Sequence, residues 1–251
     1  MLILLPPSEG KATARRGKPL DHGALDFPVL TDPRERVLDA LVELCDGDPQ
    51  VAAKTLGIGT TQLDLVELNR RLRTAPTQRA DQVYTGVLYD ALDIATLTPA
   101  AKRRATARLA ITSSLFGLVR PSDRIPAYRL SGDATLPGLG GVAATWRDHL
   151  GPVITDAVGG GLLVDLRSGT YVSFWRPAGV RSATVRVLHE HQGRRTVVSH
   201  FNKATKGRIV RALLESGADP RTPARLADTL RDLGWVVEED GGRLDVVVSA
   251  V

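Results

Sequence analysis

Two lysines at the start of a late helix have the spacing that points most directly to chemistry. Lys203 and Lys206 follow Asn202, taken as the helix cap, and at 100° per residue both fall on the side of apolar Val210. Cations in a first helical turn oppose the helix dipole. We therefore expect both amines inside a pocket, as anion ligands or a nucleophile; alternatively, their long stems reach water. Arg208 is expected to point away from the side that carries the two lysines, but it belongs to the same basic cluster and is also a candidate phosphate-binding residue.

An aspartate ends a hydrophobic strand predicted over 162–166. Asp165 is followed by Ser168 and Tyr171, so all three are expected at a sheet edge or cleft mouth. An aspartate in this position is either an acid/base group or a loop cap, and both remain open. Ser168 and Tyr171 are candidate ligand-binding residues.

The first strand, predicted over residues 1–5, ends at Pro6-Pro7 and leads into the polar turn Ser8-Glu9-Gly10-Lys11. Ser8 and Lys11 could present a hydroxyl and an ammonium to an anion. The GxxxxGK[ST] spacing of a Walker loop is absent. The pattern alone is weak, and an ordinary turn is the alternative.

Another candidate ligand-binding surface is the long loop that follows Ser113. Its cationic residues, together with Tyr128 as a stacking ring, predict a stiff recognition surface for an anionic ligand. The loop's cations are Arg120, Arg124 and Arg129. The alternative is that Asp123 pairs with one arginine simply to fold the loop.

The segment from about 48 to 73 has the pattern of a helix-hairpin-helix. Two helices flank Leu56-Gly57-Ile58-Gly59, and Thr60 could cap the second helix. Gly57 and Gly59 permit a tight turn whose amides could hold a phosphate, a contact that is salt-sensitive and blind to sequence. An ordinary turn between two helices is the alternative.

The remaining pattern predicts a mixed α/β (α+β) protein, as one domain over residues 1–251. Its central mixed sheet is flanked by helices and carries the helix-hairpin-helix as an insertion. Helices are expected over about 32–44, 98–107 and 144–158, from Lys203 and from Thr222-Pro223. A strand is expected over 108–113. Hairpins are expected over 183–201, turning at Gln192-Gly193, and over 235–249, so a doubly wound fold is disfavoured.

Composition limits the function classes. The chain has 251 residues, 43% of them hydrophobic, and a net charge of +5, which suits a polyanionic or phosphorylated partner. Its single cysteine cannot form an internal disulfide or anchor a zinc cluster. No apolar run approaches the roughly 18 residues of a spanning helix, and no signal peptide is recognisable. We therefore expect a cytoplasmic protein with no membrane partner, no metal and no cofactor. The sequence does not indicate an oligomeric state.

The chain resembles the YaaA family of peroxide-stress proteins. The resemblance rests on six segments in order, which are Pro6 to Lys11, Val83-Tyr84-Thr85-Gly86, Leu115 to Leu130, Trp146, 165–171 and Ser199 to Arg208. It implies DNA binding through a helix-hairpin-helix and a role in limiting oxidative DNA damage by holding down free iron. It implies no established reaction. The Pro-Pro-Ser-Glu-Gly-Lys turn places the chain in a different branch from members with Ser-Pro-Ala-Lys, to which the stress role belongs.

The leading hypothesis is a DNA-binding protein of the oxidative-stress response. Under this hypothesis, the turn of the helix-hairpin-helix binds one phosphate backbone of DNA, and a basic cleft is lined by Lys11, Arg120, Lys203 and Lys206. The alternative is an enzyme acting on a nucleobase or nucleotide, with a lysine as nucleophile or phosphate anchor, Asp165 as acid/base, and Tyr128 or Trp146 stacking on the base. Direct iron binding is disfavoured because only His189 and His191 have a ligand-like spacing.

Overall fold

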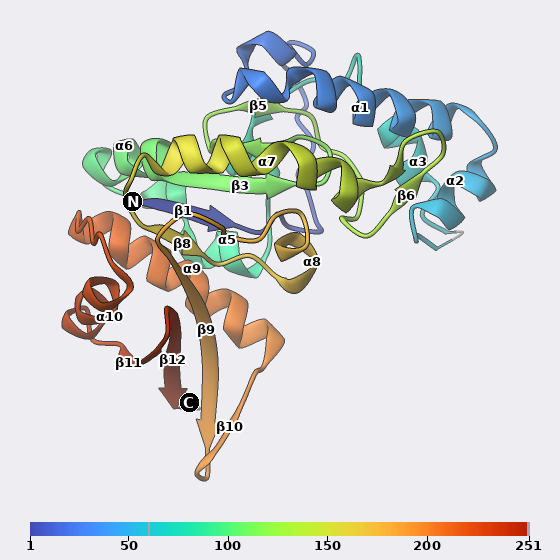
Figure 1. Ribbon diagram of the computed structural model, residues 1–251. Helices are drawn as coiled ribbons and strands as arrows, with labels where there is room; N and C mark the ends of the chain where they lie inside the picture. The colour runs from blue at the N-terminus through green and yellow to red at the C-terminus, as the bar shows by residue number, and fades with distance from the viewer. Residues whose placement is uncertain (60, 250–251) are drawn as a thin grey trace.

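A computed structural model describes residues 1–59 and 61–249 and has a mixed eight-stranded sheet at its centre. The sheet order is β11-β12-β9-β8-β1-β3-β4, and β10 also pairs with β9. The neighbouring strands from β12 to β3 are parallel, and both edges are antiparallel. Figure 1 shows β1 running through the middle of the molecule. The predicted mixed sheet is confirmed, with hairpins only at its margins.

The strands are β1 Leu2–Leu5, β2 Gln78–Arg79, β3 Leu109–Ser113, β4 Gly117–Val119, β5 Arg124–Ile125, β6 Thr135–Leu136, β7 Gly140–Gly141, β8 Leu163–Asp165, β9 Ser182–His191, β10 Arg194–Thr196, β11 Val236–Asp240 and β12 Arg243–Ser249. The helices are α1 Thr31–Asp46, α2 Pro49–Thr55, α3 Asp64–Arg70, α4 Ala80–Val83, α5 Val87–Leu92, α6 Pro99–Arg108, α7 Val142–Val158, α8 Gly169–Val172, α9 Ser199–Ser216 and α10 Pro223–Asp232. The small sheets β2-β5 and β6-β7 lie apart from the main one.

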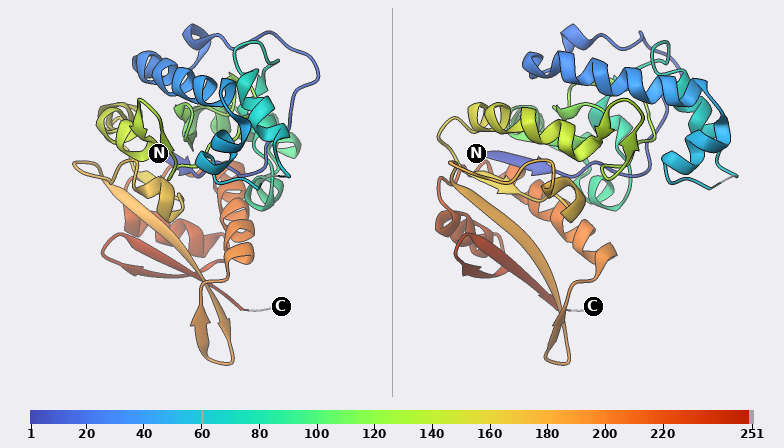
Figure 2. Two further views of the ribbon diagram at one scale, coloured as in Figure 1. Left: turned by 90° about the vertical axis from the view of Figure 1, so that its right-hand side faces the viewer. Right: turned by 45° about the vertical axis from the view of Figure 1, so that its right-hand side comes forward.

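Helices cover the sheet and close the core. Figure 1 shows α7 lying along the sheet with α1 beyond it, and α9 and α10 on the opposite side of β1. In Figure 2 the β9–β10 hairpin projects away from the body, at the far end from α1. Strand β1 is fully buried, as expected for a central parallel strand.

One glycine permits α5 and α9 to pack closely. A Cβ atom on Gly207 would lie 2.3 Å from the carbonyl oxygen of Leu88, closer than any real contact. The absence of a side chain at Gly207 therefore lets α9 lie directly against the backbone of α5. This packing fixes the position of the first turns of α9, which carry Lys203 and Lys206.

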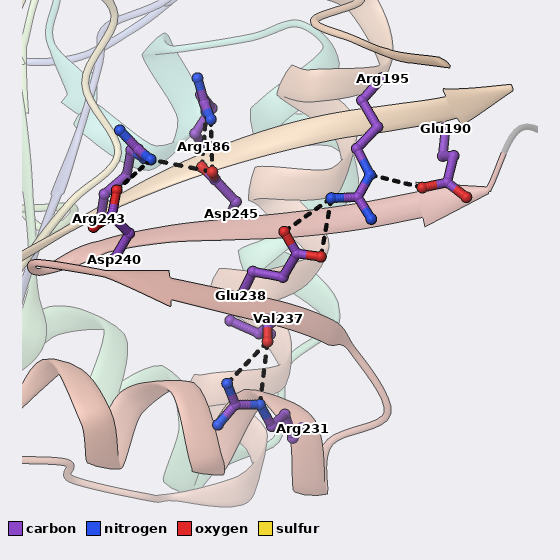
Figure 3. Close-up of polar contacts among 9 residues, drawn as sticks. All are labelled: Arg186, Glu190, Arg195, Arg231, Val237, Glu238, Asp240, Arg243 and Asp245. Atoms are coloured by element: carbon purple, nitrogen blue, oxygen red, sulfur yellow. Dashed lines mark hydrogen bonds and ion pairs between the residues drawn. The ribbon is translucent and has the colours of Figure 1, made fainter. Parts of the chain in front are cut away.

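The positive charge of the C-terminal strands is largely neutralised within them (Figure 3). Arg186 forms a bidentate pair with Asp245, at 2.7 and 2.6 Å. Arg195 lies 2.7 Å from Glu190 and 2.8 Å from Glu238. The arginines of these ion pairs therefore offer little net positive charge to a ligand.

Two predicted boundaries are wrong at the start of α9. The helix begins at Ser199 with Val198 in the capping position, so Asn202 lies inside the first turn and is not the cap. Strand β10 ends at Thr196, because its pairing with β9 covers only a few residues. The predicted hairpin turn is confirmed, with Gln192 and Gly193 both at positive φ.

Candidate functional site

Three adjacent parallel strands bring distant segments together at one edge of the sheet. β1 pairs with β8 on one side and with β3 on the other, so their carboxyl ends lie side by side. Figure 1 shows the arrowheads of β1 and β3 pointing to the side where α8 lies. Open parallel sheets bind ligands outside these carboxyl ends.

A cavity of about 760 Å³ opens at this edge, a size that suits a nucleotide-sized ligand. It is lined by the turn after β1, the segment after β8, the start of α5, the loop before β6 and the first turns of α9. Its polar and charged lining residues are Ser8, Glu9, Lys11, Thr85, Tyr89, Arg129, Ser131, Arg167, Ser168, Tyr171, Asn202, Lys203 and Lys206. The residues after β1, after β8 and on α9 that the sequence predicted to share a cleft thus lie together; we call this cavity the cationic cleft.

The turn after β1 is held in place by the segment before α5. The Thr85 amide donates to Ser8 Oγ at 3.0 Å, and Ser8 Oγ donates to the carbonyl of Gly10 at 2.5 Å. Lys11 forms an isolated antiparallel bridge with Tyr84. These bonds fix the backbone from which the Lys11 side chain enters the cleft.

Lys11 is the most perturbed cation of the cleft. Its Nζ donates to the carbonyl of Ser8 at 2.9 Å and lies 4.3 Å from the centre of the Tyr128 ring. Burial, and then the nearby Arg129 guanidinium, lower its pKa from 10.5 to about 7, although Glu9 acts in the opposite direction. An amine with this pKa is partly neutral at physiological pH.

The two lysines of α9 differ in their surroundings. Lys206 is half-buried, its Nζ donates to the carbonyl of Leu166 at 3.1 Å, and burial lowers its pKa while Asp165 raises it. Lys203 is exposed at the mouth of the cleft, which corrects the prediction that both amines lie inside.

The cleft also contains polar atoms with unused hydrogen-bonding capacity. Nε of Arg129 and Oδ1 of Asn202 are buried, and neither has a hydrogen-bond partner among the described residues. The Nη1 atom of Arg129 pairs with the exposed Glu9 at 2.9 Å. No carboxylate of the described residues lies within ion-pair distance of Lys11, Lys203 or Lys206. Buried polar atoms of this kind are rare without a ligand or water.

Asp165 is not free to act as an acid or base in this structure. Both of its oxygens accept hydrogen bonds from Arg167, at 2.9 and 2.7 Å, and the pair is buried. Arg167 also donates to the carbonyls of Tyr171 and Trp175, at 3.1 and 2.9 Å. Asp165 therefore holds the loop that carries Ser168 and Tyr171, which corresponds to the loop-cap alternative.

Several candidates of the long loop lie outside the cationic cleft. Arg120 folds back onto the carbonyls of Ala107 and Leu109, and Arg124 donates to the carbonyl of Thr77 at 2.9 Å. The Tyr128 hydroxyl is 2.8 Å from Ser113 Oγ and 3.0 Å from the Tyr84 hydroxyl.

Trp146 is completely buried and donates to the carbonyl of Ser114 at 2.7 Å. It does not line the cationic cleft, and neither does exposed Arg208. Trp146 and Tyr128 are thus core residues that support the loop and cannot stack on a ligand in this structure.

The Leu-Gly-Ile-Gly segment caps α2. The Ile58 amide donates to the carbonyl of Ala53 at 3.0 Å and the Gly57 amide to that of Lys54 at 3.2 Å, with Gly57 in the left-handed region; this is a Schellman cap. The Gly59 amide donates to Gln62 Oε1 at 3.2 Å. These amides are therefore already used within the segment. Thr60 lies outside the described residues.

A second hollow connects the hairpin with the cationic cleft. It is lined by Lys54, Thr55 and Gly57 on the hairpin side and by residues 129, 131 and 133–135 opposite. Arg129 and Ser131 line both hollows. We call the second hollow the hairpin groove.

The segment around Thr85 contributes to the cleft, although none of its residues was among the predicted site residues. Thr85, Gly86 and Tyr89 line the cleft, and the Tyr89 hydroxyl donates to the carbonyl of Pro6 at 2.7 Å. The signal was present, since Val83 to Gly86 is one of the segments that carry the family resemblance. A single sequence, however, gives no reason to place this segment beside β1.

Among residues 1–59 and 61–249, no group of three or more His, Cys, Asp and Glu is arranged to hold a metal ion. In the same part of the chain, no helix is both long and apolar enough to span a bilayer.

Fold and site together define a mixed α/β protein with a cationic cleft at the carboxyl ends of its parallel strands. The chain belongs to the family described as peroxide stress protein YaaA, whose family model matches residues 1–240. It is 53% identical to a UPF0246 protein of Streptomyces coelicolor and 46% identical to one of Corynebacterium efficiens, in each case over the full length of both chains. An uncharacterized protein of Campylobacter jejuni is 27% identical over 82% of each chain.

Proposed function

We propose that this protein acts in the oxidative-stress response by binding nucleic acid, with one phosphate seated in the cationic cleft and the adjoining backbone lying along the hairpin groove. The observation that carries the proposal is the position of Arg129, which lines both hollows and has a buried Nε without a partner among the described residues. A guanidinium in this position can bridge consecutive phosphates.

The other cations of the cleft support the same ligand. Lys203 and Lys206 line the cleft from α9, and Arg129 lines it from the loop before β6, so an anion in the cleft could receive donors from two elements. Their charge is not cancelled by a carboxylate partner within the described residues, unlike that of the arginines in the C-terminal strands. This difference favours the cleft over the C-terminal strands as the site for a polyanion.

The helix-hairpin-helix enters the proposal in a restricted form. Because the amides of Gly57 and Ile58 cap α2, the hairpin would contact the backbone through the exposed side chain of Lys54, with Gly57 allowing close approach. Binding would therefore depend little on base sequence and steeply on salt.

The test is the affinity of a short fluorescent single-stranded oligonucleotide, measured by anisotropy over a series of salt concentrations. Arg129→Ala and Lys206→Ala should each weaken binding about 10-fold and lower the slope of log K against log salt by roughly 0.7. Arg225→Ala removes one exposed positive charge from α10 and serves as the matched control. If all three variants bind equally well, or if the wild-type protein shows no salt-dependent binding, the proposal is wrong.

Lys54→Ala tests the hairpin separately. It should weaken a longer oligonucleotide that reaches the hairpin groove and leave a dinucleotide unaffected, because the dinucleotide fits within the cleft. Equal losses for both ligands would contradict the proposed path.

A further inference from the structure

We infer that the cationic cleft holds the base of a bound nucleotide beside its phosphate, and that Asn202 recognises the hydrogen-bonding edge of this base. The inference deepens the proposed function and rests on it for the phosphate bound by Arg129. It adds a specificity-determining residue and a ligand class, a nucleotide whose base carries an N–H donor. In a nucleic-acid strand, such a base must lie outside the base stack.

The side-chain amide of Asn202 is not committed to any other part of the protein. Asn202 lines the cleft from α9, and its Oδ1 atom has no hydrogen-bond partner among the described residues. Oδ1 is turned away from solvent, but rotation about χ2 exchanges Oδ1 with Nδ2, so either atom can face a ligand. A polar group in this position gains a hydrogen bond when a ligand offers the complementary group.

A phosphate cannot supply the group that Oδ1 requires. A phosphodiester at neutral pH offers only acceptor oxygens, which suit the nearby Arg129, Lys203 and Lys206 but not a second acceptor. An amide presents an acceptor and a donor side by side, and the edge of a nucleobase presents the complementary pair. The cations and the amide of this cleft are thus both satisfied by a ligand that combines a phosphate with a base.

The lining of the cleft also has an apolar component that a phosphate does not require. The volume of about 760 Å³ extends well beyond the space of one phosphate group. A base has apolar faces and a polar edge, so it can contact the apolar lining and the Asn202 amide at the same time. The apolar lining residues are Pro6, Pro7, Val87, Leu88, Leu130 and Leu166.

Tyr171 adds an accessible aromatic ring to this lining. It is half-buried, whereas Tyr89 is buried. The Tyr171 ring packs against Phe174, with ring centres 5.1 Å apart, and its carbonyl accepts a hydrogen bond from Arg167 at 3.1 Å. These contacts hold the ring in place before a ligand binds, which favours stacking on a base.

A nucleotide has donors on its base and on its sugar hydroxyls, and the experiment distinguishes the two sources. In the first arm, calorimetry compares each common nucleoside 5′-monophosphate with ribose 5-phosphate, which keeps the phosphate and the sugar hydroxyls but lacks the base. In the second arm, anisotropy compares a fluorescent strand of tetrahydrofuran abasic spacers with the same strand carrying a single base. Both arms use the full-length protein.

At least one base should raise the affinity roughly 10-fold over the base-free ligand of the same arm. Asn202→Leu should remove this preference and leave the affinity for the base-free ligand unchanged, which also shows that the variant is folded. An analogue of the preferred base without N–H donors, such as purine for adenine or N3-methylthymine for thymine, should reproduce the loss in the wild-type protein.

Two further variants complete the test. Tyr171→Leu should weaken every base-bearing ligand roughly 10-fold and leave the base-free ligands unchanged. Gln82→Leu exchanges an exposed amide that lines neither the cleft nor the hairpin groove, and it is the matched control for Asn202→Leu. It should bind all ligands as the wild type does.

The outcomes separate this inference from the proposed function. If base-bearing ligands bind the wild-type protein no tighter than base-free ligands in both arms, the inference is wrong, while salt-dependent binding of the spacer strand would still support the proposed function. If Asn202→Leu weakens the base-free ligands equally, the amide acts on the phosphate or the sugar and the inference is also wrong. If mononucleotides show an Asn202-dependent preference and no oligonucleotide binds, base recognition stands and nucleic-acid binding fails.

Discussion

The buried position of Lys11 predicts a specific dependence of stability on pH. Folding lowers its pKa from 10.5 to about 7, so between these values the unfolded chain binds more protons than the folded chain. Stability against unfolding therefore rises with pH through this window. At lower pH both states are protonated, so the destabilisation caused by burying the Lys11 ammonium is fully present and does not change with pH. From about pH 7 to about pH 9 the gain amounts to roughly 2 kcal/mol.

Lys11→Met isolates this effect, because methionine fills a similar volume and does not titrate. The free energy of unfolding, measured in urea at several pH values between about 6 and 9, should give a difference between variant and wild type that shrinks by roughly 2 kcal/mol as pH rises. Lys102→Met, which removes an exposed lysine of α6, controls for the loss of one positive charge. A difference for Lys11→Met that is constant over this range would show that the amine is not desolvated, and the reasoning about its surroundings would fail.

Three further substitutions test the packing that supports the cleft. Gly207→Ala should lower the free energy of unfolding in urea by about 1–2 kcal/mol, because the clash with the Leu88 carbonyl outweighs the gain in helix propensity. Gly169→Ala, with nothing within 4 Å of the new Cβ, is the control. Increased stability of Gly207→Ala would contradict the close approach of α5 and α9. Trp146→Phe should lower the free energy of unfolding by about 1–3 kcal/mol and leave oligonucleotide affinity unchanged, because Trp146 donates a hydrogen bond to the Ser114 carbonyl in the core. A folded variant that has lost affinity for the oligonucleotide would support the stacking role of Trp146. Asp165→Ala should destabilise by about 3 kcal/mol by leaving Arg167 buried without its partner, and a variant of unchanged stability would reopen the acid/base hypothesis.

Local signals were sufficient for much of the fold. The apolar run of β1 stops at Pro6, and the Thr222-Pro223 signal marks the start of α10, where the Thr222 side chain accepts a hydrogen bond from the Arg225 amide. The turn at Gln192-Gly193 followed from the residues that tolerate positive φ. Such features depend on a few neighbouring residues and can be predicted from them.

Tertiary context decided the rest. The helical face that carries Lys206 was predicted, but the start of α9 was not, because it depends on how soon β10 leaves the edge of β9. Tyr128 and Trp146 have residue types that suit ligand stacking, yet their polar atoms bond inside the core. Arg120 likewise donates hydrogen bonds to backbone carbonyls whose positions are set only in the folded protein.

The cleft was anticipated from strand ends, because residues after parallel strands gather at one edge. Which cation is most desolvated could not be anticipated, since Lys11 owes its surroundings to Tyr84 and Tyr128, far away in the chain. The hairpin glycines illustrate a related limit. A capping glycine and a phosphate-binding glycine share one sequence pattern, and only the hydrogen bonds of Gly57 and Ile58 distinguish them.

The most direct test of the central claim is a crystal structure of the protein with a short phosphorylated oligonucleotide. We predict a phosphate within hydrogen-bond distance of Arg129 and Lys206, with the next nucleotide lying toward Gly57. A phosphate bound at another basic surface, such as that of Lys102 and Arg103 on α6, with the cleft occupied only by water, would contradict the account.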